Sequence, residues 1–191
     1  MNKDLIIDAG KTGVEIALLE DKRLVELHQG NSESTHLVGD IYLGQVKKLL
    51  PGLNAAFIDV GSKKDGFLHY LDLGLYYKAL EKFTKICMSG GGDSMDFAKL
   101  KEPKLEKSGK IVETLKQGQV ILVQVSKEAI STKGPRLCTE ISFAGRYLVL
   151  VPFSEKVSVS QKIKSAEERN RLRKLIKSIK PDNFGIIIRT I

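Results

Sequence analysis

The chain is poor in the residues and runs that mark several classes of protein. It has only two cysteines, Cys87 and Cys138, among its 191 residues, and it has no tryptophan. Two cysteines cannot make a disulfide framework or, by themselves, a four-ligand zinc site. No apolar run approaches the roughly 20 residues that a transmembrane helix needs. The first residues, MNKDLIIDAGKTG, include acids and lack the apolar stretch of a secretory signal. These absences predict a soluble, cytoplasmic protein with no membrane partner.

The usual marks of catalysis are also missing. The three histidines, His28, His36 and His69, share no metal-ligand spacing and lie in no nucleophile–base motif, so we expect surface or strand residues. Nothing in the sequence pairs the aspartates, and a turn position is the simpler interpretation of Asp59. The glycine run 90–92 is not followed by the Gly-Lys-Ser/Thr of a phosphate-binding loop, which favours a flexible loop. The sequence therefore predicts no catalytic residue and no metal ligand in this chain.

Charge is plentiful but unevenly placed. The formal net charge is +8. Residues 1–38 are acidic on balance, residues 39–98 are neutral, and residues 99–191 hold all of the positive excess. Lysine and arginine that neutralise phosphates release condensed counterions, so this asymmetry suggests a surface for a polyanion. Lysine-rich helices are also often plain solvated faces, and charge alone favours that interpretation.

Short apolar runs separated by turn-prone residues predict a mostly β protein. The predicted strands are 4–8, 14–19, 24–28, 41–49, 53–60, 66–70, 119–127, 141–152, 157–163 and 184–191. We interpret the first three as a β-meander and the polar stretch 31–36 as a linker. Helical spacing of apolar residues predicts an amphipathic helix at 75–88.

A second helix is predicted before the last strand. Ser165 and Glu168 form a capping box, and Pro181 follows the helix end. Its apolar stripe is expected to contain Leu172, Leu175, Ile176 and Ile179. The stretch 89–116 is different in kind, because it combines a run of three glycines at 90–92 with a Lys/Glu-rich tract. We expect it to be exposed and partly disordered.

Two long blocks carry a resemblance to a known family. They are IYLGQVKKLLPGLNAAFIDVGSKKDGFLH at 41–69 and QVSKEAISTKGPRLCTEISFAGRYLVLVPF at 124–153, supported by VSVSQKI and NFGIIIRT. Both resemble the bacterial RNase E/G endoribonucleases, and the similarity covers nearly the whole chain except about 71–117. The resemblance implies an OB-fold barrel of the ribosomal-protein type, inserted in a partial RNase-H-like subdomain and followed by a partial α/β 5′-sensor segment.

The implied boundaries are 1–38 for the RNase-H-like strands, 39–136 for the barrel with an exposed insertion at about 71–117, and 137–191 for the sensor. The resemblance further implies a cytoplasmic enzyme of RNA decay and rRNA processing. Its Mg²⁺-binding catalytic aspartates, and a cysteine pair that holds Zn²⁺ between protomers, would lie outside this sequence. The chain is then expected to be the front portion of a larger, homo-oligomeric enzyme and inactive alone.

Phe57 and Phe67 are the first candidate RNA-binding residues. They lie on neighbouring predicted strands joined by GSKKD, so a hairpin can bring both rings to one face. Paired aromatics on a barrel stack with unpaired bases, although a phenylalanine in a strand is more often buried in the core. Both positions match the family's aromatic clamp for single-stranded RNA. Lys133 matches a barrel lysine that contacts RNA, and Arg136 is an unmatched neighbour.

The second candidate site concerns the RNA 5′ end. Arg189 and Thr190 match the pair that holds a terminal monophosphate in the family, through a guanidinium fork and a hydroxyl. Gly145 and Val149 match backbone positions that complete this pocket. Without the resemblance, Arg189 is simply an arginine at a strand edge. Because it lies near the end of this sequence, we expect the pocket to be incomplete or weak.

Two alternatives to an endoribonuclease portion remain. One is a stand-alone, non-catalytic OB-fold RNA-binding module. The other is an interaction scaffold whose basic surface meets a protein. A steep fall of RNA affinity with salt distinguishes the RNA-binding hypotheses from the scaffold.

Overall fold

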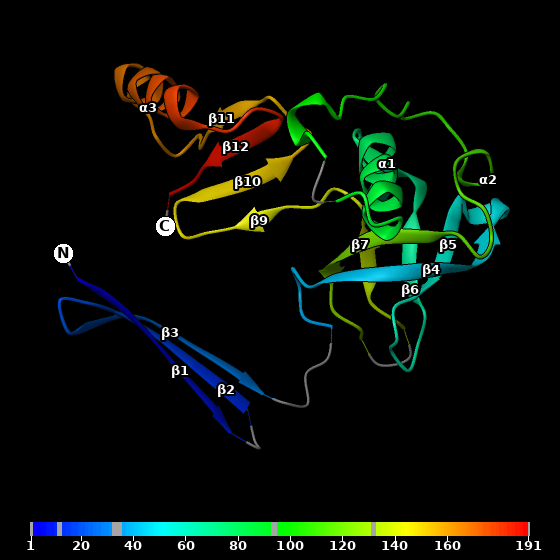
Figure 1. Cartoon of the computed structure of the whole chain (residues 1–191), viewed down its shortest axis with the longest axis horizontal. Coiled ribbons are helices and arrows are strands. Elements are labelled where there is room, and N and C mark those ends of the chain that lie inside the picture. The colour runs from blue at the N-terminus through cyan, green and yellow to red at the C-terminus, as the bar shows by residue number, and fades with distance from the viewer. Residues whose placement is uncertain (1, 11–12, 32–35, 93–94, 131–132, 191) are drawn as a thin grey trace. The chain divides into compact units, whose positions relative to one another are not determined.

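The computed structural model describes residues 2–10, 13–31, 36–92, 95–130 and 133–190 (Figure 1). Its internal contacts divide the chain into two units, residues 1–37 and 38–191. Most of the predicted linker at 31–36 lies outside the described residues. In the described part of the chain, no helix is long and apolar enough to span a membrane.

The first unit is an antiparallel meander of three strands, as predicted from the sequence. The strands are β1 (Lys3–Gly10), β2 (Gly13–Glu20) and β3 (Arg23–Asn31), in that order in the sheet. Lys3 forms an ion pair with Glu20 on the opposite strand at 2.8 Å. Strand β1 is exposed along its whole length, and its Leu5 and Ile7 side chains are 61% and 59% exposed. The apolar side chains of this sheet therefore lack the cover that β-branched strands normally have.

The second unit contains a closed barrel. Its strands are β4 (Ile41–Leu50), β5 (Ala55–Asp59), β6 (Gly66–His69), β7 (Val120–Lys127) and β8 (Arg136–Cys138), in the spatial order β4-β5-β6-β8-β7. All neighbours are antiparallel except β6 and β8, which pair in parallel between Phe67 and Arg136. A closed five-stranded barrel with this strand order is consistent with an OB-like fold. Val46, Ile58, Leu68, Val123 and Leu137 fill its interior and are fully buried.

The segment expected as an exposed insertion is in large part packed. It contains the 3₁₀ turn η2 (Tyr70–Leu73), helix α1 (Tyr77–Met88), η3 (Phe97–Lys99) and α2 (Ile111–Thr114); η1 (Pro51–Leu53) precedes it. The α1 prediction is confirmed. The prediction of exposure is wrong for Leu73, Ile111 and Leu115, which are buried in the barrel core.

The buried apolar residues of this segment are spaced too far apart in the sequence to show the period of a helix or a strand, and they complete the packing of the barrel core. The Asn54 side chain fixes the path of this segment, since its amide donates to the Gly109 carbonyl and its oxygen accepts from the Ile111 N–H. Residues 93 and 94 lie outside the described part.

The remaining elements form a mixed sheet covered by one helix. They are β9 (Phe143–Ala144), β10 (Leu148–Pro152), β11 (Val157–Val159), α3 (Ala166–Ile179) and β12 (Phe184–Ile188), and the sheet order is β11-β12-β10-β9. Ile176 of α3 packs on Val159, Ile186 and Ile188. The opposite face of the sheet carries Val149 and Ile187, which lie side by side on β10 and β12.

The second helix differs in two details from its sequence pattern. Ser165 accepts the Glu168 N–H at its N-terminus, but the Glu168 carboxylate binds Arg171, so the capping box is half formed. Its apolar stripe is narrower than predicted, because Leu175 and Ile179 are 49% and 66% exposed. Side chains of β10, β11 and β12 cover one ridge of the helix and leave the adjacent ridge exposed.

Candidate nucleic-acid interface

Phe57 and Phe67 lie together on the outer surface of the barrel. They are paired in register on β5 and β6, and their rings meet edge to face with centroids 6.1 Å apart. Their strand neighbours Ala56, Ile58 and Leu68 are fully buried, whereas both phenylalanines are only partly buried. Because side chains alternate across a strand, the two rings point away from the core. The structure thus brings the pair to one outer face, and it does not support the alternative that both are core residues.

Cations surround this ring pair. Lys48 of β4 is paired in register with Phe57, and its side chain is exposed. Lys133 is also exposed, in the β7–β8 loop, where it forms an isolated bridge with Ile130. In OB-fold proteins the second and third strands and the loop between the fourth and fifth strands bind oligonucleotides. Phe57, Phe67 and Lys133 occupy those positions of this barrel.

Gly134 and Pro135, which sequence reasoning left out, fix the position of that loop. A Cβ on Gly134 would lie 2.1 Å from the Asp65 carbonyl oxygen, so only glycine allows the loop to touch the β5–β6 turn. The Pro135 carbonyl accepts the Phe67 N–H at 2.8 Å. The dipeptide after Lys133 was the available signal, since glycine and proline together mark a turn with special backbone geometry.

Two other cations near the rings are held by carboxylates. The Arg136 guanidinium donates to Asp72 from Nε and Nη2, at 3.0 and 3.2 Å. Lys47 donates to Asp65 at 2.9 Å, and this hydrogen bond raises the pKa of Lys47. Arg136, expected as a helper of Lys133, is therefore engaged within the protein.

The four residues predicted to recognise a 5′ phosphate lie at one end of the mixed sheet. Gly145 is in the β9–β10 hairpin, where its N–H donates to the Leu148 carbonyl. Val149 is paired with Ala144 and Ile187, and β12 leads directly into Arg189 and Thr190. The Arg189 N–H donates to the Tyr147 carbonyl at 2.8 Å, so the hairpin and the Arg-Thr pair are in direct contact.

Thr190, at this end of the mixed sheet, has an unpaired side-chain hydroxyl in the described structure. Its Oγ1 is buried and has no hydrogen-bond partner among the residues that the structure describes. An unpaired buried hydroxyl costs about 1–3 kcal/mol, so such groups in native proteins usually have a reason. Arg189, by contrast, is exposed. A hydroxyl in need of a partner beside an exposed guanidinium is suitable for an anion with several acceptor oxygens.

Tyr147 is a further residue of this end that sequence reasoning missed. It lies opposite Arg189 in the strand ladder, and its side chain is 55% exposed. The Arg146 guanidinium lies over its ring, 5.3 Å from the centroid. A continued register places Tyr147, Val149, Ile187 and Arg189 on the face of the sheet that α3 does not cover. A tyrosine one residue before an apolar strand does not by itself indicate a binding residue, and its place beside Arg189 becomes visible only from the strand register.

The described residues offer no metal or catalytic centre. Nowhere in the ranges given above do three His, Cys, Asp or Glu side chains come together as possible metal ligands. His28 contacts Glu26, and His69 accepts the Leu71 N–H. His36 is buried and lies outside the strands, which contradicts its prediction as a surface or strand residue. The Mg²⁺ and Zn²⁺ sites implied for a full-length enzyme stay predictions.

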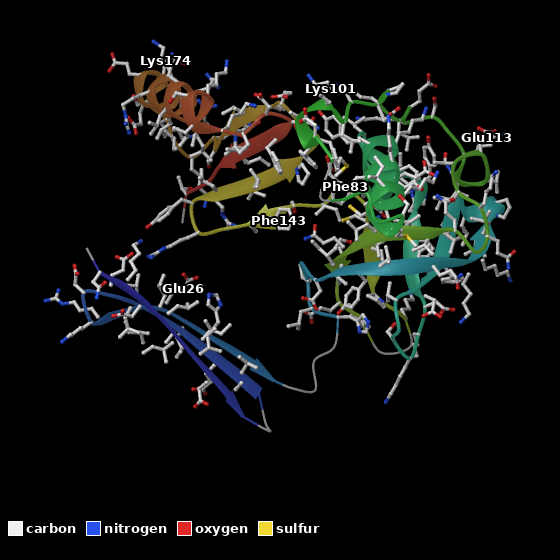
Figure 2. All side chains as sticks on the ribbon, in the orientation of Figure 1. Glu26, Phe83, Lys101, Glu113, Phe143 and Lys174 are labelled. Carbon is white, nitrogen blue, oxygen red and sulfur yellow. The ribbon has the colours of Figure 1, made fainter. Side chains whose placement is uncertain are left out.

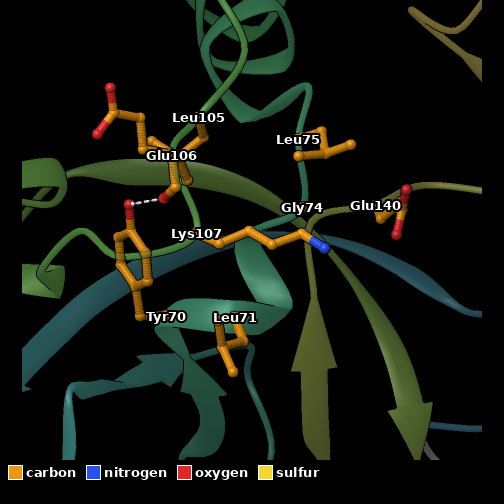
Figure 3. Close-up of a pocket in the computed structure, with 8 residues that line it drawn as sticks. All are labelled: Tyr70, Leu71, Gly74, Leu75, Leu105, Glu106, Lys107 and Glu140. Carbon is orange, nitrogen blue, oxygen red and sulfur yellow. Dashed lines mark hydrogen bonds between the residues drawn. The ribbon is translucent and has the colours of Figure 1, made fainter.

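One hollow of about 400 Å³ lies apart from these residues (Figure 3). It lies between η2 and residues 105–107, and the Tyr70 hydroxyl on its wall donates to the Glu106 carbonyl at 2.6 Å. Its lining combines apolar side chains with the charged side chains of Glu106, Lys107 and Glu140. No residue predicted to contact RNA lines it.

The fold and the two sites define a protein with an OB-like barrel. It carries an outward-facing aromatic pair on the barrel and, at one end of the mixed sheet, residues suited to bind an anion. Comparison with known proteins agrees, and the chain belongs to the ribonuclease E/G family. The model of that family, described as "Ribonuclease E/G family", matches residues 142–191. The chain is 36% identical to Ribonuclease G of Haemophilus influenzae over 187 residues, which is 98% of this chain and 34% of that protein.

Two further relatives give the same result. Ribonuclease G of Escherichia coli strain K12 is 35% identical over 190 residues, or 100% of this chain and 35% of that protein. Ribonuclease E of Nostoc sp. is 41% identical over 156 residues, or 81% of this chain and 19% of that protein. The chain therefore spans about a third of the length of the Ribonuclease G proteins that it matches.

Proposed function

We propose that this chain is the RNA-binding and 5′-monophosphate-sensing portion of an RNase E/G-type endoribonuclease. The observation that carries the proposal is the Phe57–Phe67 pair, two aromatic rings in edge-to-face contact on the outside of a closed barrel. Rings in that position stack with unpaired bases, and Lys48 and Lys133 supply charge for the adjacent phosphates. The family membership of the chain supports RNA as the polymer.

The sheet end supplies the second part of the proposal. Arg189 provides a planar donor fork, and the Thr190 hydroxyl lacks a partner within the described chain. A terminal monophosphate satisfies both groups. Tyr147, with Val149 and Ile187, offers an apolar surface for the first nucleoside. A 5′-hydroxyl end offers no anion, and a triphosphate places two further phosphates against this apolar surface.

We expect this chain to bind RNA without cleaving it, because the family resemblance matches none of its residues to a catalytic position. Cleavage of single-stranded RNA in decay and rRNA processing, with Mg²⁺, a Zn²⁺ link and homo-oligomerisation, belongs to the proposed full-length enzyme. No ligand of either metal is assigned to the described residues, which bring together no group of three possible ligating side chains.

The test compares identical oligoribonucleotides that carry a 5′-monophosphate, a 5′-hydroxyl or a 5′-triphosphate. We expect the monophosphate to bind tightest and all three to remain intact. The Arg189→Gln variant should reduce monophosphate affinity to that of the hydroxyl form, and Lys177→Gln, which removes an exposed cation of α3, is the matched control. Equal binding of all three ends refutes the sensing role. Absence of RNA binding at low salt refutes the proposal altogether.

A further inference from the structure

Segment 95–100, which the sequence predicts to be exposed and partly disordered, lies in a second apolar core between the barrel and the mixed sheet. This core is contributed by α1, by the segment itself, by one end of the sheet, and by Ile41 and Leu122 of the barrel strands β4 and β7. Its buried members are Ala79, Leu80, Leu100, Ile141 and Phe153. In the view of Figure 2, Lys101, the next residue along the chain, lies between α3 with its sheet and α1. The segment is therefore part of the junction.

The Phe97 ring contacts both sides of this junction. It meets Phe83 of α1 at a centroid distance of 6.0 Å and an interplanar angle of 83°. On the other side, Phe97 stacks on Phe184 of β12 at 4.7 Å and 23°, and it lies 4.9 Å from Phe153 at the end of β10. One side chain of the segment thus joins a helix that packs on the barrel to two strands of the sheet.

Asn183 attaches the segment to the sheet by hydrogen bonds. It is 3% exposed, and its side-chain amide donates to the Phe97 carbonyl at 2.8 Å and to the Leu100 carbonyl at 3.1 Å. Its φ of +62° is left-handed, a conformation that asparagine tolerates. The Asn183 N–H donates to Glu155, which also binds Lys180 at 2.5 Å. A buried amide nitrogen that donates two hydrogen bonds to the segment fixes one geometry rather than many.

The direct chain connection from barrel to sheet is the short stretch between β8 and β9. Gln124 of β7 anchors it by exchanging hydrogen bonds with the backbone N–H and carbonyl of Ser142. A connection at one point allows a hinge, whereas a second contact at a distance from it removes that freedom. Segment 95–100 supplies such a contact, beside the direct contact of Phe83 of α1 with Phe153 at a centroid distance of 6.0 Å.

We propose that segment 95–100 fixes the position of the phosphate end of the sheet relative to the Phe57–Phe67 pair, so that one RNA binds both. The proposal rests on the function proposed above. When two binding sites are held rigidly relative to each other, an RNA bound at one site has a high effective concentration at the other. A flexible connection between the sites loses this gain in affinity, although each site alone binds as before. Phe97 and Asn183 are positioning residues in this account, since neither one contacts RNA.

The proposal is tested with Phe97→Ala and Asn183→Gly. Glycine keeps the left-handed backbone at 183 and removes only the amide. Val46→Ala, a truncation in the barrel core, is the matched control for lost stability. Two RNAs are used, a 5′-phosphorylated dinucleotide that reaches the sheet alone and a 5′-phosphorylated oligomer long enough to reach both sites.

We expect the advantage of the 5′-monophosphate over the 5′-hydroxyl on the long RNA to fall about tenfold in both junction variants. Dinucleotide affinity and long 5′-hydroxyl RNA affinity should stay at the wild-type values, and Val46→Ala should keep the full advantage. A retained advantage in folded junction variants overturns the proposal. Loss of dinucleotide binding overturns it too, because the segment would then support the pocket itself.

A second readout needs no RNA. In a background of Cys87→Ser and Cys138→Ser, spin labels are placed at Lys116→Cys on the barrel and Lys174→Cys on α3, both exposed positions. We expect a narrow distance distribution that broadens with Phe97→Ala or Asn183→Gly but not with Val46→Ala. Equal widths in all variants overturn the proposal. A wild-type protein indifferent to the 5′ phosphate refutes the proposed function instead, and the label distances still decide the role of the segment.

Discussion

Truncation of the outer ring pair gives the sharpest prediction for RNA binding. Phe57→Ala removes a ring that contacts Phe67 at 6.1 Å and faces away from the barrel core. Stacking contributes about 1–3 kcal/mol per base, which corresponds to a loss of about fivefold to about 150-fold in affinity. The same change costs stability through the ring pair, about 0.5–1.5 kcal/mol, plus a modest loss of burial. That total lies below the roughly 3–5 kcal/mol of a fully buried phenylalanine.

The assay pairs fluorescence titration of a single-stranded oligoribonucleotide with urea unfolding of the same samples. Phe143→Ala is the control, because Phe143 lies on β9 and is itself 50% exposed. It should leave RNA affinity unchanged. The double variant Phe57→Ala/Phe67→Ala should lose less than the sum of the single losses if both rings hold one base. Unchanged affinity in Phe57→Ala, or a stability loss above about 3 kcal/mol, would refute the outward stacking role.

Three further predictions follow from single contacts. Gly134→Ala should cost about 1–3 kcal/mol in chemical unfolding and weaken RNA binding, because the new Cβ meets the Asp65 carbonyl at 2.1 Å; unchanged stability would contradict the close approach. Thr190→Val should raise stability by about 1 kcal/mol while it lowers the 5′-monophosphate advantage, and a fall in stability would show that the hydroxyl has a partner. The pKa of Glu155 lies below its usual 4.5, mainly because Lys180 donates to it, so its contribution is present above that pH and lost as the pH falls through the lowered pKa. Melting curves measured at decreasing pH should therefore show a smaller loss of stability for Glu155→Gln than for the wild type. Identical pH dependence of the two proteins would contradict the ion pair.

The longer strands were predictable because each one carries its own local signal. Alternating apolar residues and turn-forming dipeptides indicated β4 to β7, and apolar residues at helical spacing indicated α1, but no predicted strand covered β8. The residue pattern alone did not predict barrel closure, which only the family resemblance implied, since β8 contains three residues and its parallel pairing with β6 joins Phe67 to Arg136, far apart in sequence. Non-local pairing of short strands leaves no periodic pattern to detect.

The segment after α1 shows the same limit more clearly. Its composition is that of a solvated loop, yet Leu100, Ile111 and Leu115 are each buried. A segment can pack against an existing core with only a few isolated apolar side chains. Isolated apolar residues of this kind occur in the sequences of both disordered and packed segments, so the sequence does not distinguish the two. The residues proposed to bind RNA were named from the sequence by resemblance, whereas Gly134, Tyr147 and Asn183 could be singled out only from the strand register and the contacts of the structure.

The strand order of the mixed sheet has a consequence for how the protein is made. Strand β12 is the last in sequence but lies in the middle, antiparallel to β10 and parallel to β11. On the ribosome, β11 and α3 emerge before the strand that joins them to β10, and they remain without their sheet until β12 follows. Long-range pairing of this kind is slow and leaves apolar surface open in the interval. Arg189 and Thr190 directly follow that strand, so the proposed 5′-phosphate site forms only in the step that completes the sheet.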